Sequence, residues 1–317
     1  MKKIIQYLKD YFKEYLNVGF YSAVAVFLVV CIFLNYYFDI DDSFFDQFHR
    51  SIWDWPVMAL FQSFPFLVTC LFLYLFNLNR EWLTSGDFWL RVLIGFTILG
   101  FSRGFYYHRY LFEGLERVDY YFFMRSARWA STLFNMVLPL ILVNLLIEKG
   151  ADRNLYGLTR GKFEWKPYAI MLLITSVFLA IGSFLGEIRS YYPRYGKSGG
   201  AAFAEAHDLE EWITVLVYEL AYGSSFVSVE LVFRGYLIMA FSRILGGYAV
   251  VAMVTSYCFL HFGKPLGETV SSIFGGYVLG IIAFYSRSIW GGIWIHMGVA
   301  WLMELFAYLQ NDVLGSG

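Results

Sequence analysis

Residues 17–38, NVGFYSAVAVFLVVCIFLNYYF, form an apolar run without a single charged side chain. A helix that crosses the hydrocarbon core of a membrane needs about 20 mostly apolar residues, and this run supplies them. Further runs of this kind follow at 54–78, 88–107, 129–147, 167–187, 212–241, 246–262, 268–286 and 288–309. The 212–241 stretch is either one tilted helix or two pieces broken near Gly223. The sequence therefore predicts an all-α, polytopic transmembrane helical bundle with eight or nine spans.

The composition of the chain agrees with this class. Of its 317 residues, 59% are hydrophobic and only 15% are charged, whereas a soluble domain carries about 25% charged residues. A soluble enzyme, a disulfide scaffold and a disordered protein are therefore disfavoured. The net charge of −1 gives no reason to expect a nucleic-acid partner. Cys31, Cys70 and Cys258 lie in apolar runs and are expected to be buried small hydrophobes.

Four regions follow from the distribution of apolar and polar residues. Residues 1–16 carry four lysines on an amphipathic pattern and are expected to form a helix on the membrane surface. Residues 17–189 contain the N-terminal spans, and 190–211 form a long loop rich in glycine and small residues. Residues 212–309 contain the C-terminal spans, which hold most of the deep ionisable groups.

Loop charges predict the orientation in the membrane. The N-terminus carries four basic residues, and the 149–166 loop carries five, at Lys149, Arg153, Arg160, Lys162 and Lys166. Because basic loops stay in the cytoplasm, the N-terminus is expected to be cytoplasmic. The basic residues of 108–128, on the predicted outer side, run against this pattern. The chain is expected to be an integral membrane protein of a prokaryotic cell membrane.

Ionisable side chains at membrane depth need a reason, since each costs about 2.5–3.5 kcal/mol on insertion scales. Glu230 and Arg234 are four residues apart on one helix face, so a structural ion pair is their simplest interpretation. His261 lies at the end of its span, where its simplest structural role is to cap the helix. The simplest structural role of His296 is a hydrogen bond to a neighbouring carbonyl. The other deep candidates are Glu219, Glu304 and, at the start of a span, Glu268.

Taken together, a carboxylate and two imidazoles on consecutive helices suggest hydrolysis in a water-filled pocket. In one mechanism Glu230 takes a proton from water, while His261 and His296 orient the water or stabilise the oxyanion. In the other, the same three side chains hold a zinc ion that activates the water. Spacing alone does not separate these mechanisms, and a proton or ion pathway is also compatible with the residues.

Three motifs resemble those of the CAAX protease and bacteriocin-processing family of intramembrane proteases, the CPBP or Abi family. They are VELVFRGYL at 229–237, FLHFGKPLGE at 259–268 and SIWGGIWIHMGV at 288–299. The resemblance covers about residues 210–305 and implies an intramembrane endopeptidase that hydrolyses a membrane-tethered or lipidated peptide. It implies catalytic roles for Glu230, His261 and His296, membrane lipids as partners, and no obligatory cofactor.

The chain departs from the family pattern at three positions. Val229 replaces the first of two glutamates, Ala300 replaces an asparagine, and Tyr257 replaces a phenylalanine. These departures favour a subgroup with a single glutamate in the first motif. They also leave open a catalytically inactive member that acts as an immunity or scaffold membrane protein. In an active member Glu230 would be the base, supported by Arg234, Glu268 and Tyr257.

Overall fold

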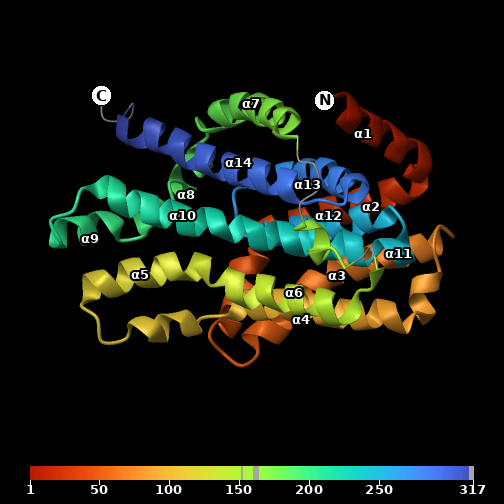
Figure 1. Cartoon of the computed structure of the whole chain (residues 1–317), viewed down its shortest axis with the longest axis horizontal. Helices are drawn as coiled ribbons and strands as arrows, with labels where there is room; N and C mark the ends of the chain where they lie inside the picture. Colours follow the sequence, from red (N-terminus) through yellow and green to blue (C-terminus); the bar gives the residue numbers. More distant parts are fainter. Residues whose placement is uncertain (151–152, 160–163, 314–317) are drawn as a thin grey trace. The chain divides into compact units, whose positions relative to one another are not determined.

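The computed structural model describes residues 1–150, 153–159 and 164–313, and all regular elements in these ranges are helical (Figure 1). Arg160 and Lys162 of the predicted basic loop lie outside the described residues. The chain divides into two compact units that are interleaved along the sequence. The first unit comprises Met1–Phe105, Leu138–Lys162 and Glu230–Trp290, and the second comprises Tyr106–Val137, Phe163–Val229 and Gly291–Gly317. The composition predicted regions that follow one another along the sequence. Each unit instead combines three separate segments, because contacts between helices that are distant in the sequence define the units.

Eight helices in the described residues are long and apolar enough to cross a membrane, which confirms the polytopic helical bundle. A ninth expected span, 246–262, contains a shorter helix, α12 (Tyr248–Leu260). At 1.5 Å per residue its 13 residues reach only about 20 Å, less than the hydrocarbon thickness of about 30 Å. The eight helices are Val18–Phe38, Asp54–Leu75, Gly86–Phe112, Arg117–Ile147, Trp165–Gly182, Glu211–Ala240, Leu266–Ser286 and Trp290–Asn311.

In the first unit, α12 is the buried centre, and nearly every one of its residues is inaccessible to solvent. It packs against α3, α13 and η9, while α3 also packs along α4. The elements of this unit are α1 (Lys2–Tyr15), α2 (Val18–Phe38), η1 (Asp41–Phe45), η2 (Asp46–Phe48), α3 (Asp54–Leu75), η3 (Glu81–Thr84), α4 (Gly86–Gly104), α6 (Leu138–Ile147), η7 (Leu155–Gly157), η9 (Leu231–Ala240), α11 (Ser242–Leu245), α12 and α13 (Leu266–Ser286).

The N-terminal helix α1 is amphipathic, as its sequence suggests. Its four lysines are exposed, whereas Ile4 and Tyr11 are buried on the opposite side. The helix packs on α13, and the Tyr11 hydroxyl donates a hydrogen bond of 2.8 Å to the carbonyl of Gly247. The buried tyrosine therefore fixes α1 to the first unit, while the lysines remain available to a polar environment.

The second unit is built around α10 and α14, with shorter helices between the long ones. Its elements are η4 (Tyr107–Phe112), α5 (Arg117–Ala130), η5 (Leu133–Val137), α7 (Trp165–Gly182), α8 (Gly186–Tyr191), η8 (Tyr195–Lys197), α9 (Gly200–Ala206), α10 (Glu211–Glu230), α14 (Trp290–Tyr308) and η10 (Leu309–Val313). The last residue of α10 and the first of α14 belong to the first unit.

The 190–211 segment is not the continuous loop that was expected, because it contains η8 and α9. The sequence of α9, GAAFAEA, explains the difference, since alanine and glutamate have high helix propensity. Phe203 anchors this helix by packing its ring 4.8 Å from that of Phe122 on α5.

The 211–240 stretch is one continuous helical segment, and it does not break near Gly223. Gly223 serves packing instead, because a Cβ atom there would lie 2.7 Å from the Trp301 ring. From Leu231 the segment continues as a π-helix, η9, and all ten of its residues are buried. π-Helical turns are rare and frequently occur at functional sites. This one begins directly after Glu230.

Candidate active site

The predicted pair of Glu230 and Arg234 is confirmed as an ion pair at the start of η9. Arg234 Nη1 lies 3.0 Å from Glu230 Oε1, and their side chains are only 1% and 0% exposed. The four-residue spacing places both groups on one face, and mutual neutralisation permits their burial. The sequence led us to expect a carboxylate lining a water-filled pocket, whereas Glu230 is fully enclosed in this structure.

Tyr257 of α12 connects this ion pair to His261. The Arg234 guanidinium lies over the Tyr257 ring, 4.0 Å from its centroid, in a cation–π contact. On α12 itself, the Tyr257 and His261 rings are 4.6 Å apart and meet edge to face. The tyrosine that replaces the family's phenylalanine therefore lies between the charged pair and the imidazole.

The hydrogen bond between His261 and the Tyr257 carbonyl defines the tautomer of the neutral ring. Its Nδ1 lies 2.8 Å from the Tyr257 carbonyl oxygen, which only accepts, so Nδ1 carries the proton. In the neutral ring Nε2 then carries the lone pair, and it lies 4.0 Å from Glu268 Oε1. His261 itself is 5% exposed.

The turn between α12 and α13 is held in place by Tyr36 of α2. The Tyr36 hydroxyl donates to the Lys264 carbonyl at 2.6 Å and lies 2.7 Å from the Thr269 hydroxyl. Thr269 in turn donates to the His261 carbonyl at 2.7 Å. The Lys264 ammonium pairs with Glu268, so one carboxylate faces both a lysine and His261. These contacts fix the backbone from His261 to Thr269.

Gly263 occupies a position in this turn that requires glycine. Its φ is +80°, and an added Cβ would lie 2.1 Å from Asp41 Oδ2. Burial raises the pKa of the Asp41 carboxyl, and Arg103 partly offsets that effect. The turn after His261 is therefore shaped both by a left-handed backbone and by a carboxylate packed against it.

Replacing Gly263 by alanine is expected to destabilise the protein. The left-handed conformation costs a side chain about 1–2 kcal/mol, and the clash with Asp41 adds to this cost. Thermal unfolding of the detergent-solubilised chain measures the loss of stability.

The double variant Gly263→Ala/Asp41→Ala separates the two contributions. It should recover the part of the stability that the clash removes, but not the part due to φ. If the double variant is no more stable than expected from adding the two single effects, the Asp41 contact does not constrain this turn. Because the raised pKa means that ionised Asp41 opposes folding, Asp41→Ala should also stabilise the chain more at neutral than at acidic pH.

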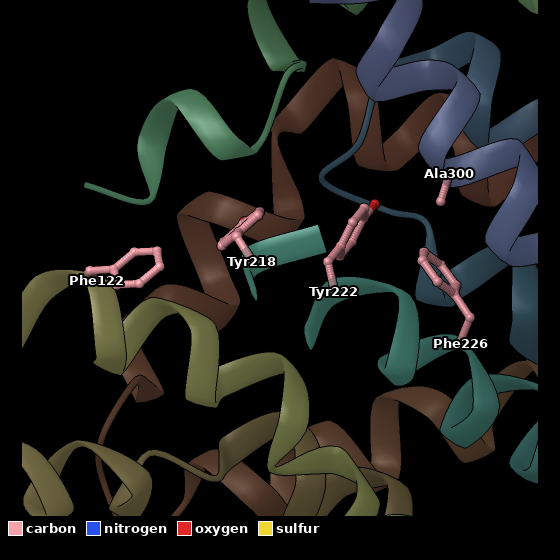
Figure 2. Packing of buried hydrophobic residues seen from close by; sticks show 5 residues of the cluster. All are labelled: Phe122, Tyr218, Tyr222, Phe226 and Ala300. Carbon is pink, nitrogen blue, oxygen red and sulfur yellow. The ribbon is translucent and has the colours of Figure 1, made fainter. Parts of the chain in front are cut away.

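His296 lies on α14 in the second unit, where its ring packs 4.4 Å from that of Phe226. Phe226 belongs to an apolar cluster that also contains Ala300, one helical turn after His296 (Figure 2). Ala300 is 4% exposed, so the position where the family pattern has asparagine is used for packing in this unit. The cluster consists of Phe122, Tyr218, Tyr222, Phe226 and Ala300, from α5, α10 and α14.

Glu304, the other deep carboxylate of α14, has a structural role. It accepts hydrogen bonds from the backbone amides of Arg194 and Tyr195, at 2.8 and 3.2 Å. These contacts hold the segment before α9 against α14. The sequence identified Glu304 as a deep ionisable group, and the structure supplies the backbone donors that satisfy it.

The first unit contains a buried charge network that was not predicted from the sequence. Arg91 of α4 is 2% exposed and pairs with Glu148, which is 3% exposed, and with Asp87 at 2.9 Å. Glu148 also pairs with Arg243 and accepts a hydrogen bond of 3.1 Å from the Tyr156 hydroxyl. Arg91 lies within the apolar run 88–107, and this position was the signal that could have revealed the network.

The described residues hold no group of three or more His, Cys, Asp or Glu side chains placed to bind a metal ion. Within the first unit, His261 and Glu268 supply two donors 4.0 Å apart. Protein zinc sites use three or four ligands.

Comparison with known proteins gives a family match for the C-terminal segment. The model of the family described as type II CAAX prenyl endopeptidase Rce1-like matches residues 211–302. This match confirms the resemblance to CAAX proteases, and the matched segment contains Glu230, His261 and His296. Searches of curated proteins and of solved structures gave no match. With its eight apolar helices, the chain is a polytopic membrane protein, and the match supports the general class of intramembrane peptidases.

Proposed function

We propose that this protein is an intramembrane endopeptidase that hydrolyses a membrane-tethered, lipid-anchored peptide. The observation that carries the proposal is the series of contacts from Glu230 through Arg234 and Tyr257 to His261. This series lies within the segment that matches the CAAX endopeptidase family. A purely structural ion pair requires no imidazole at its end, whereas a hydrolytic site does.

Glu230 is the proposed general base. Its carboxylate takes a proton from a water molecule as the water oxygen attacks the scissile carbonyl. The protonated carboxyl then gives this proton to the leaving nitrogen as the peptide bond breaks. Arg234 pairs with the Glu230 carboxylate in the buried site, and its positive charge offsets the cost of burying a carboxylate there.

His261 and His296 are the proposed second component of the site. His261 would use Nε2, since Nδ1 is engaged by the Tyr257 carbonyl. In its protonated form Nε2–H donates to the oxyanion, with Glu268 stabilising the imidazolium. His296 is assigned the matching role on the basis of the family pattern. Glu230 is fully buried, so hydrolysis requires the surrounding helices to open and admit water and the peptide.

The test is a cleavage assay with purified full-length protein in detergent. Prenylated peptides with a C-terminal CAAX-type sequence are compared with the same peptides lacking the lipid. We expect cleavage of the lipidated peptides, and His261→Ala and His296→Ala should each lower kcat by about 10²–10³-fold, the usual cost of removing one oxyanion donor.

The matched control is His49→Ala, which removes a half-exposed histidine from the first unit outside the site. It should leave kcat unchanged. Equal turnover by the wild type and the two site variants, with all chains folded, would refute the proposed mechanism. If neither the wild type nor the variants cleave the peptides, and the site variants keep the biological phenotype of the wild type, the inactive scaffold protein is supported instead.

A further inference from the structure

A cavity of about 290 Å³ lies in the second unit, and none of the residues assigned to hydrolysis lines it. One wall is the first half of α5, and the other is the segment from η8 into α9. The two walls are joined by the packing of Phe122 on Phe203. The cavity is lined by Arg117, Val118, Tyr121, Arg125, Lys197, Ser198, Gly199 and Ala202.

The charged side chains of this cavity are all basic. Arg117, Arg125 and Lys197 line it, and none of the described lining residues is acidic. Asp119 on the same helix is engaged elsewhere, because its Oδ1 lies 2.6 Å from His207 Nε2. Three cations around one concave surface produce a positive potential that attracts an anion.

The orientation of two of these cations is set by neighbouring groups. Arg117 lies over the Tyr121 ring at 5.8 Å, and Lys197 donates a hydrogen bond of 3.0 Å to the Ser190 carbonyl. Both contacts leave further donors on each side chain, because a guanidinium has five and an ammonium three. The remaining donors can bind the oxygens of one phosphate group.

The position of the cavity along the second unit indicates the source of the anion. The exposed apolar face of α10 begins at Trp212, 64% exposed, and continues at Leu216 and Leu220. Exposed apolar residues of a membrane-spanning helix face lipid, and tryptophan is enriched at the membrane–water interface. Both walls of the cavity adjoin the start of a membrane-spanning helix, because Arg117 begins the span Arg117–Ile147 and Ala202 shortly precedes the span Glu211–Ala240. The ends of such helices meet the headgroup region.

We propose that this cavity binds the phosphate of an anionic phospholipid headgroup. The three cations bind the phosphate oxygens, and Val118, Tyr121 and Ala202 provide apolar contacts for the adjoining glycerol and upper acyl carbons. Basic pockets at the membrane surface bind lipid headgroups through the same combination of charge and apolar surface. This proposal is independent of the proposed peptidase activity.

The experiment titrates the purified full-length chain in neutral detergent with short-chain phosphatidylglycerol, and bound lipids are counted by native mass spectrometry. Phosphatidylcholine and inorganic phosphate are titrated in parallel. We expect phosphatidylglycerol to bind with a stoichiometry of one. Binding should be about tenfold weaker in Arg117→Gln/Arg125→Gln, because each basic residue contributes to the attraction for anionic lipid.

Two further variants make the result specific to the cavity. Ala202→Phe fills the cavity without changing charge and should also weaken binding. Arg128→Gln/Arg189→Gln removes the same charge from exposed positions that do not line the cavity and should bind normally. Equal weakening in both double variants would overturn the proposal. Equal binding of phosphatidylcholine, or equal competition by inorganic phosphate at the same concentration, would overturn the assignment to an anionic lipid.

Discussion

Replacing Glu230 by glutamine is expected to lower kcat for peptide hydrolysis by about 10²–10⁴-fold, the usual contribution of a general base. Glutamine keeps the size of the side chain and removes only its ability to accept a proton. The measurement is single-turnover cleavage of a lipidated peptide by the purified protein. Glu219→Gln is the matched control, because it removes another carboxylate from α10, eleven residues earlier on the same helix.

A loss of activity in Glu230→Gln must be separated from a loss of folding. The single variant leaves Arg234 buried without its counter-ion, which is expected to destabilise the protein by about 3–5 kcal/mol. The double variant Glu230→Gln/Arg234→Met removes both charges and should restore most of that stability, since replacing a buried pair by apolar groups is often neutral. If the double variant is stable and regains activity, Glu230 is not the base.

The second large effect is expected at Glu148, outside the site. Replacing it by glutamine leaves Arg91, which is 2% exposed, with the half-exposed Asp87 as its one ionic partner among the described residues. Removing one partner of a buried ion pair lowers the free energy of unfolding by about 3–5 kcal/mol. The free energy of unfolding in mixed detergent micelles measures this loss.

The controls use the other members of the same network. Arg243 is also a partner of Glu148, but its own side chain is 43% exposed. Arg243→Gln should therefore lower the free energy of unfolding by less than about 1 kcal/mol. Arg91→Met/Glu148→Met removes both buried charges and should be more stable than Glu148→Gln. If Arg243→Gln is as damaging as Glu148→Gln, burial is not the source of the effect.

Periodicity and apolar run length predicted the local features of the molecule. The spans follow from runs of about 20 apolar residues, and the Glu230–Arg234 pair follows from a spacing of four residues on one helix. The His261 motif was also recognisable from the sequence. Such features depend on neighbours within one helix, which the sequence places directly.

The remaining features depend on residues that are distant in the sequence. The contact of Arg234 with Tyr257 and the clamp of Tyr36 on Thr269 join helices that only packing brings together. The left-handed Gly263 and its neighbour Asp41 form a close contact of the same kind. The short α12 was overestimated as a full span, because hydropathy does not distinguish a helix buried in protein from one exposed to lipid.

The interleaving of the two units has a consequence for biosynthesis. The last segment of the first unit is Glu230–Trp290, and the last segment of the second unit is Gly291–Gly317. A nascent chain that has emerged from the ribosome only as far as Val229 therefore holds two unfinished units. Its Arg91 and Glu148 are already synthesised, whereas Arg234 and His261 are not. The early helices must therefore remain in the translocon or in lipid, without their final partners, until the last helices are synthesised. Packing of both units is then completed only after membrane insertion, and a truncated chain would complete neither unit.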